Sequence, residues 1–144
     1  MLQSVKVKDY MAANLVTFTP DMDIMDAVSE LIRKRISGAS VLDEHGSIVG
    51  ILSERDCLKV TLHTTYYADG GAGRVAEYMQ PDVTTIDADM SILELAELFL
   101  NKPLRRYPVV ERNRLVGQIS IRDVLRALAV IAAPESHARR NEFI

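Results

Sequence analysis

The sequence predicts an α+β fold made of two pseudo-symmetric βαββα units packed sheet to sheet. Three observations support this prediction: the chain repeats internally, each copy has the same order of predicted strands and helices, and one motif occurs at the same place in both. The motif reads GILSERDCL over residues 50–58 and GQISIRDVL over residues 117–125. In each copy a strand ends at a serine and runs into a helix. One such unit has a single sheet face and little core of its own, so we expect two units to cover each other's sheets.

The internal repeat appears when the chain is shifted by 68 residues, a shift that falls to 67 after the turn that follows Glu44. A missed repeat would give the wrong fold, so this pattern decides the architecture. It divides the chain into a first unit at 1–63, a linker at 64–73, a second unit at 74–133 and a polar tail at 134–144. The identical pairs are Val7 with Val75, Tyr10-Met11 with Tyr78-Met79, Thr17 with Thr85, Asp21-Met22 with Asp89-Met90, Ile24 with Ile92, Lys34 with Lys102, Val41 with Val109, Val49-Gly50 with Val116-Gly117, and Ser53, Arg55, Asp56 and Leu58 with Ser120, Arg122, Asp123 and Leu125.

Each unit is predicted to contain a helical lead-in, a strand, a helix, two strands around a turn and a second helix. Asp23 is expected to cap the first long helix, and Ser91 with Glu94 forms a capping box for its counterpart. Pro134 is expected to stop the last helix. The first unit's elements are expected over 5–11, 15–19, 24–36, 39–42, 48–52 and 53–62. The second unit's are expected over 74–79, 83–86, 91–101, 107–110, 115–119 and 121–133.

The composition is that of a globular protein of 144 residues, with 48% hydrophobic and 26% charged residues. A net charge of −3 gives no general attraction to nucleic acid or to an anionic membrane. Lys6, Lys8 and Asp9 occupy the place where a signal peptide would need an apolar core. The longest apolar run, 127–133, is too short to span a bilayer. The single cysteine, Cys57, excludes an internal disulfide and fits a cytoplasmic protein.

The repeated Ser-x-x-Asp motif has two interpretations. As an N-cap box, the serine oxygen accepts from backbone N–H groups and the acid lies in the first helical turn, which the helix dipole favours. As a binding site, the helix N-terminus presents N–H groups to a phosphate, and the carboxylate accepts hydroxyl groups of a ribose. An isolated motif favours the first interpretation, but its recurrence in both repeats favours the second.

The order of elements, the doubling and the Gly-x-x-Ser-x-x-Asp ending resemble a tandem pair of CBS (cystathionine β-synthase) domains, the Bateman module, over about residues 5–133. The strand at 107–110 reads YPVV and matches the aromatic/apolar-Pro-Val second strand of that family. The corresponding residues 39–42 read ASVL and lack the proline.

The resemblance implies a regulatory ligand that contains adenosine, such as AMP, ADP, ATP or S-adenosylmethionine, bound in clefts between the repeats. It implies that the motif's Asp binds the ribose and that its Ser faces the phosphate. It also implies a flat homodimeric disc and a change of angle between its halves that an effector protein reads. The candidate residues from the two motifs are Ser120, Arg122 and Asp123 and, in the first repeat, Ser53, Arg55 and Asp56.

Positive charge is concentrated between residues 101 and 126, where seven cations accompany two anions, Glu111 and Asp123. Guanidinium groups suit bidentate contact with phosphates, and the family pattern lets Arg105 and Arg106 face a ligand. The alternative is a solvated basic face. The first repeat has Ser37 and Gly38 at these two places, and only Lys34 and Arg35 nearby compensate. The seven cations are Lys102, Arg105, Arg106, Arg112, Arg114, Arg122 and Arg126.

A base pocket is predicted from residues of the short strand and the second strand, because apolar walls with backbone hydrogen bonds suffice to hold adenine. These are Val83 with Tyr107 and Pro108 in the second repeat, and Leu15 with Ala39 in the first. The alternative for each of them is ordinary core.

Catalytic and metal-binding patterns do not stand out. His45, His63 and His137 have no metal-ligand spacing, and neither a nucleophile–His set nor a phosphate-binding GxxxxGK[ST] loop is evident. We therefore expect no enzyme, no metal and no cofactor beyond the regulatory nucleotide. Cys57, next to Asp56, is interpreted as a buried small residue whose thiolate is disfavoured.

The final helix is apolar on almost every side after Arg126, so it must be covered on more than one side, which agrees with a homodimer. The rival hypothesis is a scaffold of the same fold that serves only for dimerisation or docking. The linker at 64–73, with Tyr66-Tyr67 and several glycines, is expected to be a plain connection; the alternatives are a lid or a segment that docks a partner.

Overall fold

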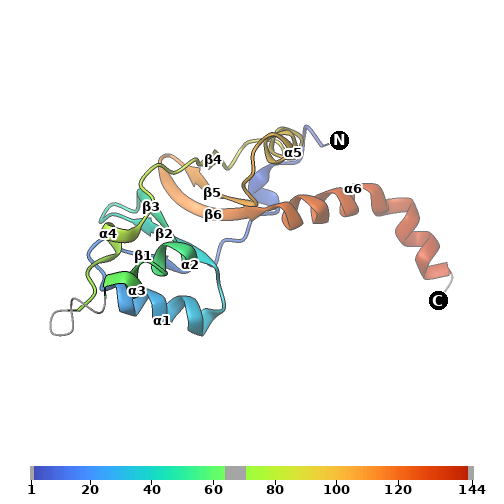
Figure 1. The fold of residues 1–144 in the computed structure, drawn as a ribbon. Coiled ribbons are helices and arrows are strands. Elements are labelled where there is room, and N and C mark those ends of the chain that lie inside the picture. The colour runs from blue at the N-terminus through green and yellow to red at the C-terminus, as the bar shows by residue number, and fades with distance from the viewer. Residues whose placement is uncertain (1, 64–70, 143–144) are drawn as a thin grey trace. The chain divides into compact units, whose positions relative to one another are not determined.

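The computed structural model describes residues 2–63 and 71–142, and these form two compact units (Figure 1). One unit contains residues 2–14, 85–112 and 116–142. The other contains residues 15–84, apart from the undescribed 64–70, together with 113–115. Each unit has a three-stranded sheet and helices, so the predicted mixed α+β class is confirmed. The predicted linker lies mostly outside the described residues.

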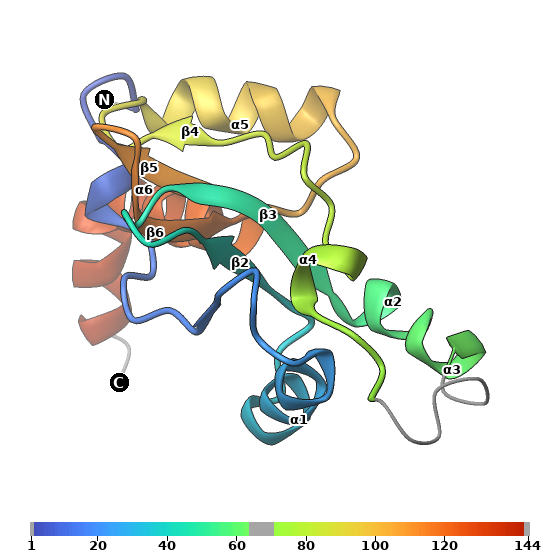
Figure 2. The ribbon, with the colours of Figure 1, turned by 90° about the vertical axis from the view of Figure 1, so that its left-hand side faces the viewer.

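The first repeat forms a sheet in the order β1-β2-β3. β1 (Thr17–Phe18) runs parallel to β2 (Gly38–Leu42), which pairs antiparallel with β3 (Ile48–Ser53). The parallel pair requires a crossover, and α1 (Ile24–Lys34) supplies it and lies against the sheet (Figure 2). The core contains Phe18, Ile24, Ala27, Leu31, Val41 and Leu52, all less than 5% exposed.

The ends of α1 show which part of the local prediction holds. Asp23 caps the helix as predicted, because its side chain accepts a hydrogen bond from the Met25 N–H at 2.8 Å. The helix ends at Lys34, two residues before the predicted end at residue 36, and Arg35 is its C-cap. Arg35 adopts the left-handed conformation with φ 55°, and its N–H bonds to the Ile32 carbonyl. This is the role that glycine usually fills, so the sequence gives little sign of it.

The second repeat forms a sheet in the order β4-β5-β6. β4 (Ile86–Asp87) runs parallel to β5 (Arg106–Glu111), and a tight turn with positive φ at Arg112 and Asn113 leads into β6 (Arg114–Ser120). α5 (Ile92–Asn101) is capped as predicted by Ser91, whose hydroxyl accepts from the Glu94 N–H at 3.1 Å. α6 (Ile121–Glu142) follows β6 directly. The core contains Ile86, Ile92, Leu95, Tyr107, Val109, Ile119, Val124 and Ala127.

Each lead-in segment packs on the sheet of the other repeat and not on the sheet that follows it in the sequence. η1 (Val7–Asp9) belongs to the unit of β4–β6, where Val7 is fully buried and Ala12 bridges Gln118 with N···O distances of 2.8 and 2.9 Å. α4 (Val75–Tyr78) belongs to the unit of β1–β3, where Gln80 bridges Ile51. Each compact unit is therefore completed by the lead-in of the other repeat.

Glycines in the repeated motif make room for this exchange. A Cβ atom on Gly117 would lie 2.5 Å from the Met11 sulfur and 2.9 Å from the Ala12 carbonyl oxygen. A Cβ atom on Gly50 would lie 2.5 Å from the Met79 sulfur and 3.1 Å from the Gln80 carbonyl oxygen. The backbones of strand and lead-in thus approach so closely that a side chain at either position would collide.

Several predicted boundaries are wrong. β1 is two residues long, and β4 starts at Ile86, not at 83. The helix predicted over 53–62 is split into α2 (Glu54–Cys57) and α3 (Val60–His63). Between them the Lys59 N–H bonds to the Asp56 carbonyl three residues earlier, which tightens the turn.

The last helix does not stop at Pro134, because α6 continues to Glu142. A proline inside a helix removes one N–H donor and crowds the carbonyl four residues earlier. These effects end some helices but only bend others. The tail predicted at 134–144 is thus helical up to residue 142. Within the described parts of the chain, no helix combines the length and the apolar character needed to cross a bilayer.

Candidate functional site

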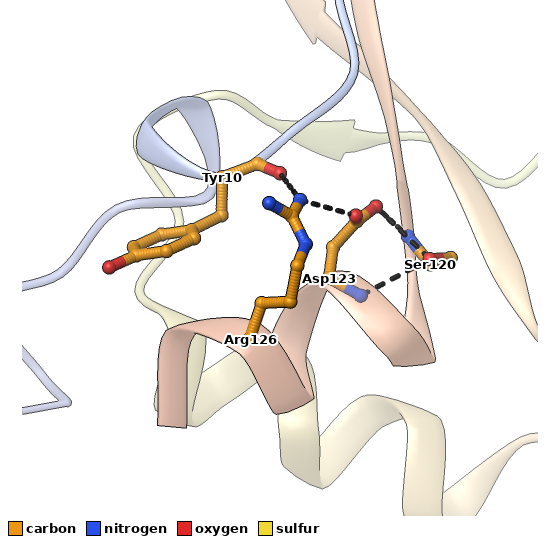
Figure 3. Close-up of polar contacts among 4 residues, drawn as sticks. All are labelled: Tyr10, Ser120, Asp123 and Arg126. Carbon is orange, nitrogen blue, oxygen red and sulfur yellow. Dashed lines mark hydrogen bonds and ion pairs between the residues drawn. The ribbon is translucent and has the colours of Figure 1, made fainter. Parts of the chain in front are cut away.

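The Ser120–Asp123 motif forms a complete capping box at the start of α6 (Figure 3). The Ser120 hydroxyl accepts from the Asp123 N–H at 3.2 Å. In return, the Asp123 Oδ2 accepts from the Ser120 N–H at 2.8 Å and from the Ser120 hydroxyl at 3.0 Å. The capping interpretation is therefore correct for this motif, and the binding interpretation must rest on what the box leaves available.

The second carboxylate oxygen of Asp123 also has a partner. Its Oδ1 accepts from Arg126 Nη2 at 2.7 Å, and the same nitrogen donates to the Tyr10 carbonyl at 3.1 Å (Figure 3). The Asp123 side chain is 17% exposed and that of Arg126 is 58% exposed. Asp123 thus stands at the edge of the protein surface, oriented by bonds on both oxygens.

An open hollow of about 620 Å³ lies beside the box. It is lined by the predicted Arg105, Arg106, Ser120 and Arg122, with Ile121 and Leu125. The lining thus contains three guanidinium side chains and no carboxylate. Such a hollow attracts an anion and offers it bidentate hydrogen bonds.

The helix N-terminus is less free than the sequence suggests. The Ile121 N–H donates to the Arg105 carbonyl at 3.1 Å, and the Asp123 N–H donates to Ser120. Two of the first three amides of α6 are therefore used within the protein. An anion in the hollow would depend mainly on the arginine side chains, and the helix dipole would add to them.

The first repeat builds the same box with a more enclosed acid. Asp56 Oδ2 accepts from the Ser53 N–H and hydroxyl, both at 2.9 Å, and its Oδ1 accepts from Gln80 Nε2 at 2.9 Å. Lys59 lies 3.9 Å from that oxygen. The Asp56 side chain is only 7% exposed.

The hollow found near this first box is apolar. It measures about 270 Å³ and is lined mostly by apolar residues of α1–α3 and of the segments that follow α1 and α2, with Glu54 and without arginine. Arg55 is exposed and does not line it. Of these two hollows, only the one beside the box of the second repeat is lined by arginines.

The predicted base-pocket residues are mostly core. Tyr107 is fully buried against Phe99, with ring centroids 5.1 Å apart, and Pro108 beside it is buried. Ala39 is 5% exposed within the core of the first repeat. Val83 and Leu15 are half-buried, and both belong to the unit of β1–β3. Ordinary packing explains Tyr107 and Ala39, whereas Val83 and Leu15 keep some accessible surface.

Burial shifts the pKa of two residues that the sequence analysis singled out, Tyr107 and Cys57. Burial raises the pKa of Tyr107, and the Tyr107 hydroxyl has no hydrogen-bond partner among the described residues. Burial raises the pKa of the Cys57 thiol, and the nearby Asp56 and Glu54 carboxylates raise it further. Cys57 is half-buried, not fully buried as predicted, but its thiolate is disfavoured for the predicted reason.

Sequence reasoning missed Arg126, Tyr10 and Gln80 as neighbours of the two acids. The spacing of Asp123 and Arg126, three residues apart on one helix, is a signal for an ion pair that could have been used. No local signal points to Tyr10 or Gln80, since each lies in the lead-in of the opposite repeat.

Two sheets of the same order, each followed by a helix that opens on a Ser–Asp box, define a tandem-repeat α+β protein with an anion-attracting hollow at one box. The model of the CBS domain family matches residues 7–63 and again residues 75–130. The chain therefore belongs to the CBS domain family and carries two such domains in tandem, which confirms the predicted resemblance.

Chains similar to this one include a CBS domain-containing protein and solved CBS domain pairs. The CBS domain-containing protein YhcV of Bacillus subtilis is 31% identical over 118 residues, which are 82% of this chain and 81% of that protein. The crystal structure of CBSX2 in complex with AMP has a TM-score of 0.76 at 26% identity, covering 89% of this chain and 98% of that one; CBSX2 is from Arabidopsis thaliana. The CBS domain pair of protein MJ0100, in complex with 5-methylthioadenosine and S-adenosyl-L-methionine, has a TM-score of 0.68 at 26% identity, covering 87% and 96%.

Proposed function

We propose that this protein is a non-catalytic regulatory module that binds an adenosine-containing nucleotide beside the Ser120–Asp123 box. The hollow lined by Arg105, Arg106 and Arg122 is the observation that carries the proposal. Two similar structures contain AMP or S-adenosylmethionine, which supports the ligand class. Bound nucleotide would shift the module between conformations only by its different affinity for them, and an effector protein would read that shift.

Each part of the nucleotide has a proposed contact. The phosphate lies among the three arginines and near Ser120, where charge-assisted hydrogen bonds are strongest. A ribose hydroxyl donates to Asp123, whose charged carboxylate lies at the edge of the surface. The backbone at Tyr107 and Pro108 is proposed for the base, because a flat apolar ring needs little more than apolar walls with backbone hydrogen bonds.

Ligand binding is expected to raise the melting temperature of the protein. A ligand at 100 times its Kd adds about 2.7 kcal/mol to the free energy of unfolding, which shifts the melt by several degrees. We would compare AMP, ADP, ATP, S-adenosylmethionine and NADH by thermal shift and confirm hits by calorimetry. Arg122→Gln is expected to weaken nucleotide binding, whereas Arg114→Gln, an exposed arginine outside the hollow, serves as the matched control.

Absence of any shift and of any binding heat across these ligands would remove the nucleotide proposal. The scaffold hypothesis would then take its place. Equal losses for the Arg122 and Arg114 variants would show a general charge effect and would remove the hollow as the site.

A homodimer is the second proposal, and repeated apolar exposure supports it. Ile32 is 72% exposed and its repeat partner Leu100 is 86% exposed; Leu58 is 65% exposed and its partner Leu125 is 57% exposed. The same helical positions are thus apolar and uncovered in both repeats, which is typical of association surfaces.

We expect the protein to sediment as a dimer at micromolar concentration. Leu100→Glu is expected to shift the equilibrium to the monomer, because a buried unpaired charge is costly at an apolar interface. Arg114→Glu, at the start of β6, is the control that should leave the dimer intact. A monomeric wild-type protein at that concentration would count against this proposal.

A further inference from the structure

Arg126 contacts the acid of the candidate site and the lead-in of the opposite repeat with one nitrogen. Its Nη2 donates to Asp123 Oδ1 at 2.7 Å and to the Tyr10 carbonyl at 3.1 Å (Figure 3). The Arg126 side chain is 58% exposed, and exposed ion pairs contribute little to stability. The contact therefore serves mainly to orient the Asp123 carboxylate relative to the lead-in segment.

The bonds already made by Asp123 decide where a ligand hydroxyl can be accepted. A carboxylate offers about four acceptor positions, two on each oxygen. Oδ2 accepts two hydrogen bonds from Ser120, so its positions are filled. Oδ1 accepts one bond, from Arg126, and keeps one position. A hydroxyl that leaves the capping box intact must therefore donate to Oδ1, the oxygen that Arg126 holds.

The first repeat shows the same arrangement with different residues. Asp56 Oδ1 accepts from Gln80, which belongs to the lead-in segment that packs on that repeat. Lys59, at the position equivalent to Arg126, lies 3.9 Å from the same oxygen. In both repeats, then, the outer oxygen of the acid is connected to the exchanged lead-in, directly in one and through Arg126 in the other.

We propose that Arg126 is a positioning residue that fixes Asp123 Oδ1 for a sugar hydroxyl and couples occupancy of that oxygen to the lead-in segment at residues 7–12. The inference rests on the proposed nucleotide site and adds the element through which the ligand is sensed. A hydroxyl that donates to Oδ1 shares this acceptor oxygen with Arg126, and a second donor on one oxygen weakens the first hydrogen bond. The hydrogen bond from Arg126 to the Tyr10 carbonyl then changes in strength. The lead-in at residues 7–12 is therefore held more or less tightly according to whether the ligand is bound.

The test compares AMP with 2′,3′-dideoxy-AMP, which keeps the phosphate and the base but lacks the sugar diol. Arg126→Gln is expected to weaken AMP binding about 3- to 10-fold, as for the loss of one oriented hydrogen bond, and to leave dideoxy-AMP binding unchanged. Arg126→Lys is expected to recover part of the loss, since the first repeat uses Lys59 at this place. Arg122→Gln should weaken both ligands alike, because both carry the phosphate.

Amide hydrogen exchange measures the coupling separately. AMP is expected to change exchange at Met11 and Ala12 in the wild-type protein, and Arg126→Gln should abolish that change while the melting temperature stays close to that of the wild type. Equal losses of both ligands in Arg126→Gln, or an AMP-induced change that persists in this variant, would overturn the inference alone. A wild-type protein that binds neither ligand would overturn the proposed function and this inference with it.

Discussion

Asp123→Ala is expected to remove most of the nucleotide-dependent rise in melting temperature. The substitution deletes the carboxylate that bonds to Ser120, a residue of the arginine-lined hollow, and with it the proposed charge-assisted hydrogen bond to the ribose, worth about 1.5–3 kcal/mol. Such a loss weakens binding about 10- to 100-fold. Calorimetric titration of AMP into wild type and variant measures it directly.

Asp56→Ala is the matched control. It is expected to lower the stability of the protein more than it weakens nucleotide binding. Asp56 is more enclosed than Asp123, with 7% against 17% of its side chain exposed. Its removal leaves the Gln80 amide without its acceptor, which costs about 1–3 kcal/mol of stability. Binding should change less than in Asp123→Ala. If Asp56→Ala proved the more damaging to binding, the assignment of the site to the second repeat would be wrong.

Gly117→Ala is expected to lower the free energy of unfolding, although alanine usually stabilises a strand relative to glycine. The new Cβ would lie 2.5 Å from the Met11 sulfur and 2.9 Å from the Ala12 carbonyl oxygen. Overpacking of this kind costs about 1–3 kcal/mol, whereas the reduced freedom of the unfolded chain returns about 0.4–1 kcal/mol. The collision is the larger effect, and urea denaturation measures the difference.

A second substitution separates the two collisions at Gly117. In a Met11→Ala background, Gly117→Ala meets only the Ala12 carbonyl, so its cost should fall without vanishing. Gly50→Ala repeats the experiment in the other unit, where the backbone oxygen of Gln80 is slightly farther away at 3.1 Å. A Gly117→Ala protein as stable as the wild type would show that the lead-in at residues 7–12 does not pack closely against β6.

Local features of the fold were predictable because their causes are local. Asp23 and Ser91 cap their helices as predicted, since a cap depends on bonds to residues two or three positions away. The order of strands and helices follows from the repeat and from apolar periodicity. The errors lie where tertiary contacts or unusual backbone override these signals, as at Arg35 with its left-handed conformation and at Pro134 within α6.

The candidate site shows the same division. The residues predicted to face an anion, Arg105, Arg106, Ser120 and Arg122, line one hollow, although 14 positions separate Arg106 from Ser120. These residues come together because two neighbouring strands return the chain to the same end of one sheet, and their contact with an anion stays a prediction. For Tyr107, sequence pattern does not distinguish a pocket wall from core, and the structure places its side chain in the core.

By itself, the sequence determined the doubled unit, the class of fold and the Ser–Asp boxes, because each depends on periodicity, caps and spacing within a short stretch. Only the tertiary structure decided which lead-in completes which unit, that Gln80 bonds to Asp56, and that Arg126 bonds to the Tyr10 carbonyl. Those contacts join residues more than 20 positions apart, such as Gln80 with Asp56 and Tyr10 with Arg126. No local preference encodes such a pairing; it follows from burying Val7 and Val75 in the cores that have room for them.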